Sequence, residues 1–234
     1  MLVEPSPLEL LRSHSLAGLV QAEIERLILS GELVGGAKLN ENAIASRLGI
    51  SRGPVRESFR TLEEMGLVRL EKNRGVFVRE INAEEAADLY QVRAALDRVV
   101  GIQLALHVTA DQLQQLRSLV DQMDDAAKRS DVNAYHPMNV QLHEWLVEFA
   151  GNRKLAVIYR RLINELTLFR RHTLAHFETM AVSNAEHHAI LDAIASGDPV
   201  VAGETMQNHI LASSERTQRA LRLYFEPERR GDAA

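Results

Sequence analysis

The stretch Ile50–Val78 reads ISRGPVRESFRTLEEMGLVRLEKNRGVFV, and it decides the fold of the first third of the chain. Ser51 can cap a helix, Pro54 suits the first turn of that helix, and Gly66 is placed to end it. The segments LVRLEK and GVFVREI then alternate in character around the turn residues KNR. The stretch therefore predicts a helix followed by a two-stranded wing.

The residues before this stretch predict two more helices. Apolar side chains recur at helical spacing over Leu16–Ser30, and the glycine-rich GELVGGAKL ends that helix in a turn. Asn40 can cap a short helix that closes at Gly49. The order helix, helix, turn, helix, wing is that of a winged helix-turn-helix domain.

The residues from Ala83 onward show helical periodicity without a convincing strand. The predicted helices are Glu84–His107, Ala110–Arg129, Ala134–Ala150, Arg153 to about His176, Ala181–Ser196 and Val200–Tyr224. Six helices in this length indicate a compact bundle. The predicted fold is mainly α, with an N-terminal tail at 1–12, a winged helix-turn-helix domain at 13–80, an all-helical domain at 81–225 and a C-terminal tail at 226–234.

Composition narrows the class of protein. The chain has 234 residues, a net charge of −5 and no cysteine, so disulfides and thiolate metal sites are excluded. No apolar run is long enough to span a membrane, and the first residues lack the features of a secretory signal, so we expect a cytoplasmic protein with no membrane partner. Asn42–Arg79 nevertheless carries eight basic and four acidic side chains, which indicates a nucleic-acid partner.

The second helix of a helix-turn-helix motif places its first residues at base edges in the major groove. Arg52 and Arg56 are four residues apart, so they share one helix face, and arginine can pair with guanine through two hydrogen bonds. Gly53 keeps the helix start slim, and Lys72 and Arg74 lie at the expected wing tip. The alternative is that these cations form an ordinary solvated face.

The sequences LNENAIASRLGISRGPVRESFRTLEEMGLV and NRGVFV resemble the DNA-binding domain of the GntR family of bacterial transcription regulators. The resemblance implies operator DNA as the partner and arginine contacts at Arg52 and Arg56. It also implies a contact at Asn42, although that position is often Arg in the family. The full candidate DNA-binding set is Arg52, Arg56, Asn42, Ser51, Gly53, Lys72, Asn73 and Arg74.

Three histidines on separate predicted helices form a second candidate site. Asn139 and His143 are four residues apart on one helix face, while His187 and His209 lie in the last two helices. Imidazoles from several helices can converge on one metal in a bundle core. The alternative is that they are separate polar groups, partly buried or at the surface.

The motifs LYQVRAALD, NVQLHEWLVEFAGNRKL, EHHAILDAIASGD and MQNHI resemble the FadR-type ligand-binding domain called FCD, in its VanR-like branch. The resemblance implies a divalent transition metal, Zn, Ni or Mn, held by Asn139, His143, His187 and His209. Asn replaces the commoner Asp at 139, which weakens the site and favours an anionic ligand on the metal. His188 and His136 are less favoured alternatives as ligands.

Arg93 is the candidate anchor for an effector. In the family, an arginine at this position faces the cavity and can hold a carboxylate, whereas the alternative is a surface ion pair with Asp97. Asn164, Arg170 and Arg171 are candidates for the opposite wall. A cation and an arginine together favour a small organic anion, a carboxylate or a phosphonate.

The sequence thus predicts a ligand-responsive regulator that binds a palindromic operator as a homodimer. The resemblance implies a repressor that its effector releases from DNA, which is the family's usual behaviour. A metal-sensing regulator and a helical protein-interaction module are the alternatives. Three histidines and an oxygen around a metal also occur in hydrolases and oxygenases, but no nucleophile motif, phosphate loop or HExxH accompanies them, so we expect no enzyme.

Overall fold

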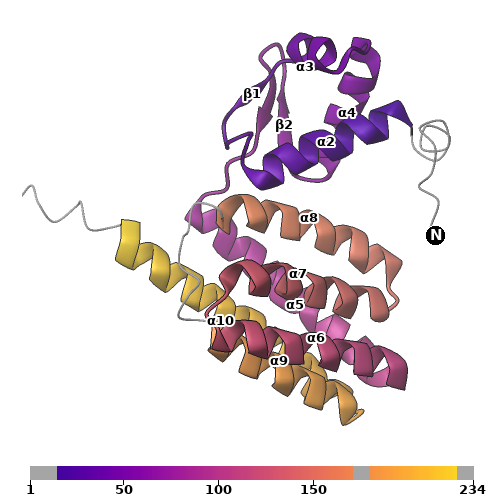
Figure 1. Ribbon diagram of the computed structural model, residues 1–234, viewed down its shortest axis with the longest axis vertical. Helices are drawn as coiled ribbons and strands as arrows, with labels where there is room; N and C mark the ends of the chain where they lie inside the picture. The colour runs from indigo at the N-terminus through magenta and orange to yellow at the C-terminus, as the bar shows by residue number, and fades with distance from the viewer. Residues whose placement is uncertain (1–14, 171–179, 226–234) are drawn as a thin grey trace, which may run out of the picture. The chain divides into compact units, whose positions relative to one another are not determined.

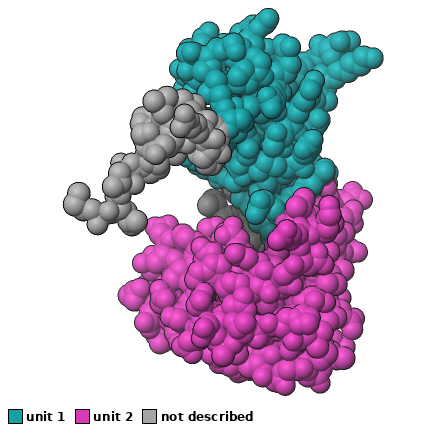
Figure 2. All heavy atoms as spheres, turned by 90° about the vertical axis from the view of Figure 1, so that its right-hand side faces the viewer, with its two compact units in different colours: residues 1–82, 160–171 teal, residues 83–159, 172–234 magenta. Residues whose placement is uncertain are grey.

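The computed structural model describes residues 15–170 and 180–225 of the chain (Figure 1). The chain divides into two compact units, which Figure 2 distinguishes by colour. Unit 1 comprises residues 1–82 with 160–171, and unit 2 comprises residues 83–159 with 172–234. Helix α8, Arg153–Arg170, contributes residues to both units, which the linear division of the sequence did not anticipate.

Unit 1 contains the predicted winged helix-turn-helix. Its elements are α2 (Leu16–Ser30), β1 (Lys38–Leu39), α3 (Glu41–Leu48), α4 (Arg52–Glu64), β2 (Val68–Glu71) and β3 (Gly75–Val78). Asn40 caps α3 as predicted, because its side chain accepts hydrogen bonds from the N–H groups of Asn42 and Ala43. Ser51 occupies the same position before α4, but its side chain makes no capping hydrogen bond.

The wing is part of a three-stranded antiparallel sheet with the order β1-β3-β2. The predicted strands β2 and β3 pair directly, and β1 adds a short third strand in which Lys38 faces Phe77. Asn73 adopts a left-handed conformation (φ 62°) in the turn between β2 and β3, where a short polar side chain is tolerated. The two-stranded prediction therefore missed β1, a segment too short to show alternation.

Apolar side chains from the helices and the sheet form the core of unit 1. Phe59, Leu62, Leu67 and Val68 are buried as predicted, whereas Met65 is half-buried. They are joined in the core by Val20, Ile24, Leu27, Ile28, Val55 and Val78. This core fixes α4 against α2 and leaves the opposite face of α4 exposed.

The described part of unit 2 is helical throughout. The bounds are α5 (Ala83–His107), α6 (Ala110–Lys128), α7 (Val132–Phe149), α8 (Arg153–Arg170), α9 (Met180–Ala195) and α10 (Pro199–Phe225), with α8 shared with unit 1. The six predicted helices are confirmed, although the predicted extension of the fourth beyond Arg170 lies outside the described residues. Helix α7 begins earlier than predicted, because Asp131 caps it and Pro137 is accommodated within its first turns.

Helices α5 and α10 approach closely where two glycines meet. A Cβ atom added at Gly101 would lie 2.5 Å from the carbonyl oxygen of Ala202 and 3.0 Å from the Cα atom of Gly203. Only a residue without a side chain allows this approach. The contact brings α10, which carries His209, against α5, which carries Arg93.

Among the described residues, no helix is both long and apolar enough to cross a bilayer.

Candidate functional sites

The candidate DNA-binding residues lie on one exposed region of unit 1. Arg52, Gly53 and Arg56 are exposed on the first turns of α4, and Asn42 is exposed on α3. The guanidinium of Arg56 donates two hydrogen bonds to Glu41, from Nε to Oε2 at 3.1 Å and from Nη2 to Oε1 at 2.8 Å. Nη1 of Arg52 lies 3.5 Å from Oδ1 of Asn42. The prediction did not include Glu41.

The turn of the wing exposes Lys72, Asn73 and Arg74. Arg74 forms an ion pair with Glu71 at 2.6 Å, and its guanidinium also lies 5.9 Å from the centroid of the Phe77 ring. The Arg74 side chain is exposed, whereas the Glu71 side chain is only 19% exposed and also pairs with Arg69 at 3.0 Å. Arg69 would stay beside Glu71 if Arg74 turned towards a phosphate.

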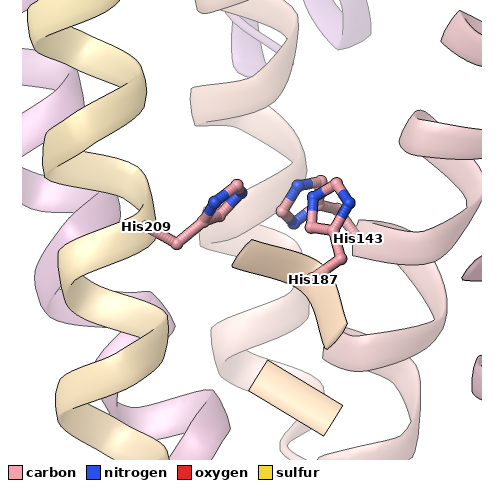
Figure 3. Close-up of side chains that lie close together, drawn as sticks. All are labelled: His143, His187 and His209. Carbon is pink, nitrogen blue, oxygen red and sulfur yellow. The ribbon is translucent and has the colours of Figure 1, made fainter. Parts of the chain in front are cut away.

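Three buried imidazoles come together in unit 2 from three helices (Figure 3). His143 belongs to α7, His187 to α9 and His209 to α10, and their exposed fractions are 8%, 0% and 5%. The ring centroids are 4.8 Å to 5.6 Å apart, and one ligating nitrogen from each ring lies within 4.8 Å of the others. This spacing suits three ligands of one metal ion after a small adjustment.

The hydrogen bonds of Asn184 determine which nitrogen of His187 carries the proton. The amide nitrogen of Asn184 donates to the carbonyl oxygen of Val120 at 3.2 Å and to Oδ1 of Asp124 at 2.5 Å, so the amide oxygen must face His187. That oxygen can only accept, and it lies 3.3 Å from Nδ1 of His187. The proton is therefore on Nδ1, and Nε2 keeps its lone pair.

Nε2 of His187 is buried and has no hydrogen-bond partner among the described residues. Burial lowers the pKa of His187 well below its ordinary value, and the positive charge of a protonated His209 lowers it further. The His187 ring is therefore neutral at pH 7. A buried polar atom without a partner is costly, and such an atom calls for an explanation. A metal ion bound there would supply one.

Glu186 orients His209 in a comparable way. Nδ1 of His209 lies 2.7 Å from Oε2 of Glu186, and Arg216 donates two hydrogen bonds to the same carboxylate, at 2.6 Å and 2.8 Å. Burial by itself raises the pKa of Glu186, but the bonds from His209 and Arg216 bring it down to about 2. Burial lowers the pKa of His209. A neutral His209 then donates from Nδ1 and presents Nε2 as a ligand.

The remaining candidate ligands differ in placement. Asn139 is half-buried on α7, one turn before His143 and on the same helix face. His188 pairs with Asp124 at 2.8 Å and lies in a second group with Asp121. His136 is exposed in the first turns of α7. Neither His188 nor His136 belongs to the buried group of three.

Arg93 is buried in a polar cluster with Asp97 and Tyr159. Its Nε lies 3.1 Å from the Tyr159 hydroxyl and 3.5 Å from Oδ2 of Asp97, and the Tyr159 hydroxyl donates to Oδ1 of Asp97 at 3.3 Å. The pair with Asp97 thus exists, but inside the protein instead of at its surface. Burial raises the pKa of Asp97 to about 6, although Arg93 opposes that shift.

The charge of Arg93 acts on His209, whose pKa it lowers in the same direction as the larger effect of burial. Arg93 and His209 therefore share one electrostatic environment. An anion near both would be favoured by that environment.

The predicted opposite wall of the effector site has a different placement. Asn164 is buried in unit 1, where its amide donates to the carbonyl oxygen of Met65 at 3.2 Å, at the end of α4. Its neighbour Glu165 pairs with Arg79 at 2.8 Å. Asn164 is therefore not part of the effector site proposed below. Arg171 and the side chain of Arg170 lie outside the described residues.

Sequence reasoning missed Glu186, Asn184 and Tyr159. The first two stand beside His187 in the sequence NAEHH, and polar residues next to a candidate ligand were the available signal. The Arg216 partner of Glu186 and the Tyr159 partner of Arg93 come from other helices. No periodicity within one helix could have found those pairs.

Two family models match the chain. The model described as bacterial regulatory proteins, gntR family, matches residues 16–78. The FCD domain model matches residues 88–212, which is more than half of the chain.

Named relatives share most of this length. A relative from Paenarthrobacter nicotinovorans named "Probable D-xylose utilization operon transcriptional repressor" is 29% identical over 79% of this chain and 81% of its own. An uncharacterized HTH-type transcriptional regulator of Streptomyces ambofaciens is 30% identical over 86% of this chain and 84% of its own. A Bacillus licheniformis protein named "Gluconate operon transcriptional repressor" is 26% identical over 61% of this chain and 58% of its own.

Solved structures agree with the fold. The crystal structure of a GntR transcriptional regulator from Rhodococcus sp. RHA1 has a TM-score of 0.71 and 26% identity, covering 88% of this chain and 99% of its own. E. coli McbR/YncC has a TM-score of 0.72, covers 88% of this chain and 98% of its own, and at 17% identity supports the fold alone.

The matched families and these relatives are regulators of transcription, which confirms the prediction that the chain is not an enzyme. The chain belongs to the gntR family of bacterial regulatory proteins, with an FCD domain following its winged helix-turn-helix domain.

Proposed function

We propose that this regulator is a repressor that binds a two-fold-symmetric operator as a homodimer and releases it when a small organic anion binds beside a metal ion in the FCD domain. The observation that carries the proposal is the buried group of three histidines, in which Nε2 of His187 has no hydrogen-bond partner among the described residues. The repressor role is supported by the names of two relatives, which are called repressors of a D-xylose utilization operon and of a gluconate operon.

The DNA contact is assigned to α4 and to the wing turn. The exposed first turns of α4 carry Arg52 and Arg56 on one side, and the wing turn carries Lys72. A helix of this length buries too little surface for operator-level affinity, so two copies on two half-sites are expected. Arg56→Ala should weaken operator binding by about 1–3 kcal/mol and relax sequence preference, whereas Lys72→Ala should weaken all sequences alike. Normal operator binding by Arg56→Ala would contradict this assignment.

The residues present suit a divalent transition metal. His187 donates a hydrogen bond from Nδ1 to Asn184, and His209 donates one from Nδ1 to Glu186. Each imidazole therefore offers Nε2 as a ligand. Their lowered pKa values keep them neutral and able to ligate at pH 7. We assign Asn139 as the fourth ligand, through its amide oxygen. Histidine and oxygen ligands discriminate poorly among Zn, Ni and Mn, so the choice of metal is left to elemental analysis.

The effector class follows from charge. Three neutral imidazoles and an amide leave the charge of a divalent ion uncompensated, and the Glu186 carboxylate is itself neutralised by Arg216. Arg93 adds positive potential nearby. A carboxylate or phosphonate would bind the metal and gain from that potential. Gluconate, which appears in the name of the Bacillus licheniformis relative, is a carboxylate and so falls within this class.

A thermal-shift screen of small carboxylates and phosphonates, with and without chelator, tests the proposal. An effector should raise the melting temperature of metal-loaded protein and lose most of this effect after chelation. The double variant Arg93→Met/Asp97→Asn removes both charges of the buried pair and should weaken the effect further. An anion that kept its full effect in both conditions would exclude this pocket.

The second candidate function is a metal-sensing regulator, which the same three histidines favour. Operator binding measured after dialysis against chelator, and again after metal is restored, separates the two. A change in DNA affinity caused by the metal alone would support the metal sensor. DNA affinity that responds only when an anion is added to metal-loaded protein would support the metabolite sensor.

A further inference from the structure

A carboxylate lies among the arginines of the recognition helix. Glu41 stands in the first turn of α3, directly after the capping residue Asn40, and its side chain is 25% exposed. Besides its two hydrogen bonds with Arg56, it lies 3.7 Å from Nε of Arg52. The carboxylate thus faces both arginines that we assign to base contacts.

An acidic side chain at this place works against DNA affinity in one respect. It repels phosphates and cancels part of the positive charge that attracts the duplex. The ion pairs of Glu41 add little to the stability of the fold, because Arg52 and Arg56 are 63% and 59% exposed and exposed pairs contribute little. The position of Glu41 therefore calls for a benefit that appears when DNA is bound.

The geometry of the pair indicates what that benefit is. Arg56 uses Nε and Nη2 for Glu41, so both bonds lie along one edge of the planar guanidinium. Neither bond involves Nη1. The second edge, formed by Nη1 and the outward N–H of Nη2, remains directed away from the carboxylate. That edge is the fork that matches guanine O6 and N7.

We propose that Glu41 is a specificity-determining residue, which holds the guanidinium of Arg56, and through the same carboxylate that of Arg52, in the orientation that reads guanine. The proposal rests on operator binding by α4, as proposed above. An arginine held in advance loses less side-chain freedom when it meets the correct base. On a wrong base or on phosphates, the held orientation offers no gain while the negative charge still repels. Glu41 therefore raises the ratio of specific to non-specific affinity.

The test compares Glu41→Ala and Glu41→Gln with the wild type on two duplexes of equal length. One duplex is a sequence selected by the wild-type protein from a random pool, and the other is a scrambled version of it. Glu41→Ala should bind the selected duplex at least about tenfold more weakly and the scrambled duplex as well as, or more tightly than, the wild type. Glu41→Gln keeps one acceptor and should fall between the two. Glu64→Gln, an exposed acid at the other end of α4, is the charge-matched control and should retain the wild-type ratio.

A double-mutant cycle shows whether Glu41 acts through Arg56. In the Arg56→Ala background, the loss of binding to the selected duplex caused by Glu41→Ala should be much smaller, because only Arg52 is then left for Glu41 to hold. Equal increases in affinity for both duplexes on removing Glu41 would overturn the proposal, because they would show repulsion alone. An undiminished loss in the Arg56→Ala background would also overturn it. Equal unfolding midpoints in urea for wild type and variants exclude misfolding as the cause.

The two proposals fail in different ways. If no sequence is enriched from the pool, or if Arg56→Ala binds the selected duplex normally, operator reading by α4 fails and takes the role of Glu41 with it. If Arg56→Ala loses specificity while Glu41→Ala keeps it, operator reading stands and only the role of Glu41 is refuted.

Discussion

Glu186→Gln should weaken metal binding without removing any metal ligand. The 2.7 Å bond from Nδ1 of His209 to the Glu186 carboxylate holds the imidazole ring with Nε2 toward the other two histidines. Glutamine keeps a carbonyl oxygen but loses the charge, and it must serve both His209 and Arg216 with one acceptor. A charge-assisted bond becomes a neutral one, which is about half as strong.

The expected loss of metal affinity is about 10–100-fold, the range for partners that orient metal-bound histidines. This corresponds to about 1.4–2.8 kcal/mol of binding free energy. Because the Glu186 side chain is 26% exposed, water can replace part of the lost contact, and the lower half of that range is expected.

Competition with a chromophoric chelator at pH 8, where the histidines are neutral, measures the dissociation constant directly. Asp192→Asn on the same helix is the matched control, since Asp192 is 69% exposed and pairs with Arg117 at the surface. The reasoning is refuted if Glu186→Gln binds metal as tightly as Asp192→Asn. A loss equal to that of His209→Ala would also contradict it, because the ligand itself is retained.

Three further outcomes are expected. Gly101→Ala should lower the free energy of unfolding by about 1–3 kcal/mol through overpacking, measured by urea denaturation; no loss would contradict the close contact of α5 and α10. Metal-free protein should lose stability as pH falls below about 6.5, by at most about 1.4 kcal/mol per pH unit for each histidine. The pKa values of His187 and His209 are lowered in the folded protein, so the unfolded chain takes up protons first. The slope should be shallower in His187→Gln, which leaves the opposing contribution of Asp97, with its raised pKa, unchanged. Asn139→Asp should tighten metal binding by adding a negative ligand, and an unchanged dissociation constant would argue against Asn139 as a ligand.

Local pattern predicted most of the secondary structure. Asn40 and Gly49 at the ends of α3, and Gly66 after α4, act on their own neighbours in the chain. The helical periodicity of unit 2 reflects burial of one face of each helix. Histidines on three helices of a bundle could meet in its core, but the resemblance to the FCD domain was needed to favour one group over separate polar residues; the structure brings the three together.

Contacts between distant segments could not be predicted in the same way. Strand β1 has two residues and exists because β3 pairs with it. Asn164 was predicted to line the effector site, but its partner is a main-chain oxygen 99 residues away. Tyr159 is paired with Arg93 from a separate helix. Such pairs depend on how the elements pack, and no periodicity in a single sequence records that packing.

Strand β1 has a consequence for exchanging parts between related regulators. Its two residues pair with β3 on one side and lead through Asn40 directly into the turn of α3 that carries Glu41. The Lys38–Glu41 segment therefore links the wing, through the pairing of β1 with β3, to the arginine proposed to read bases, through the hydrogen bonds between Glu41 and Arg56. A chimera that takes the wing from one relative and α4 from another would need the Lys38–Glu41 segment to match both, so the two reading elements should be inherited and engineered as one piece.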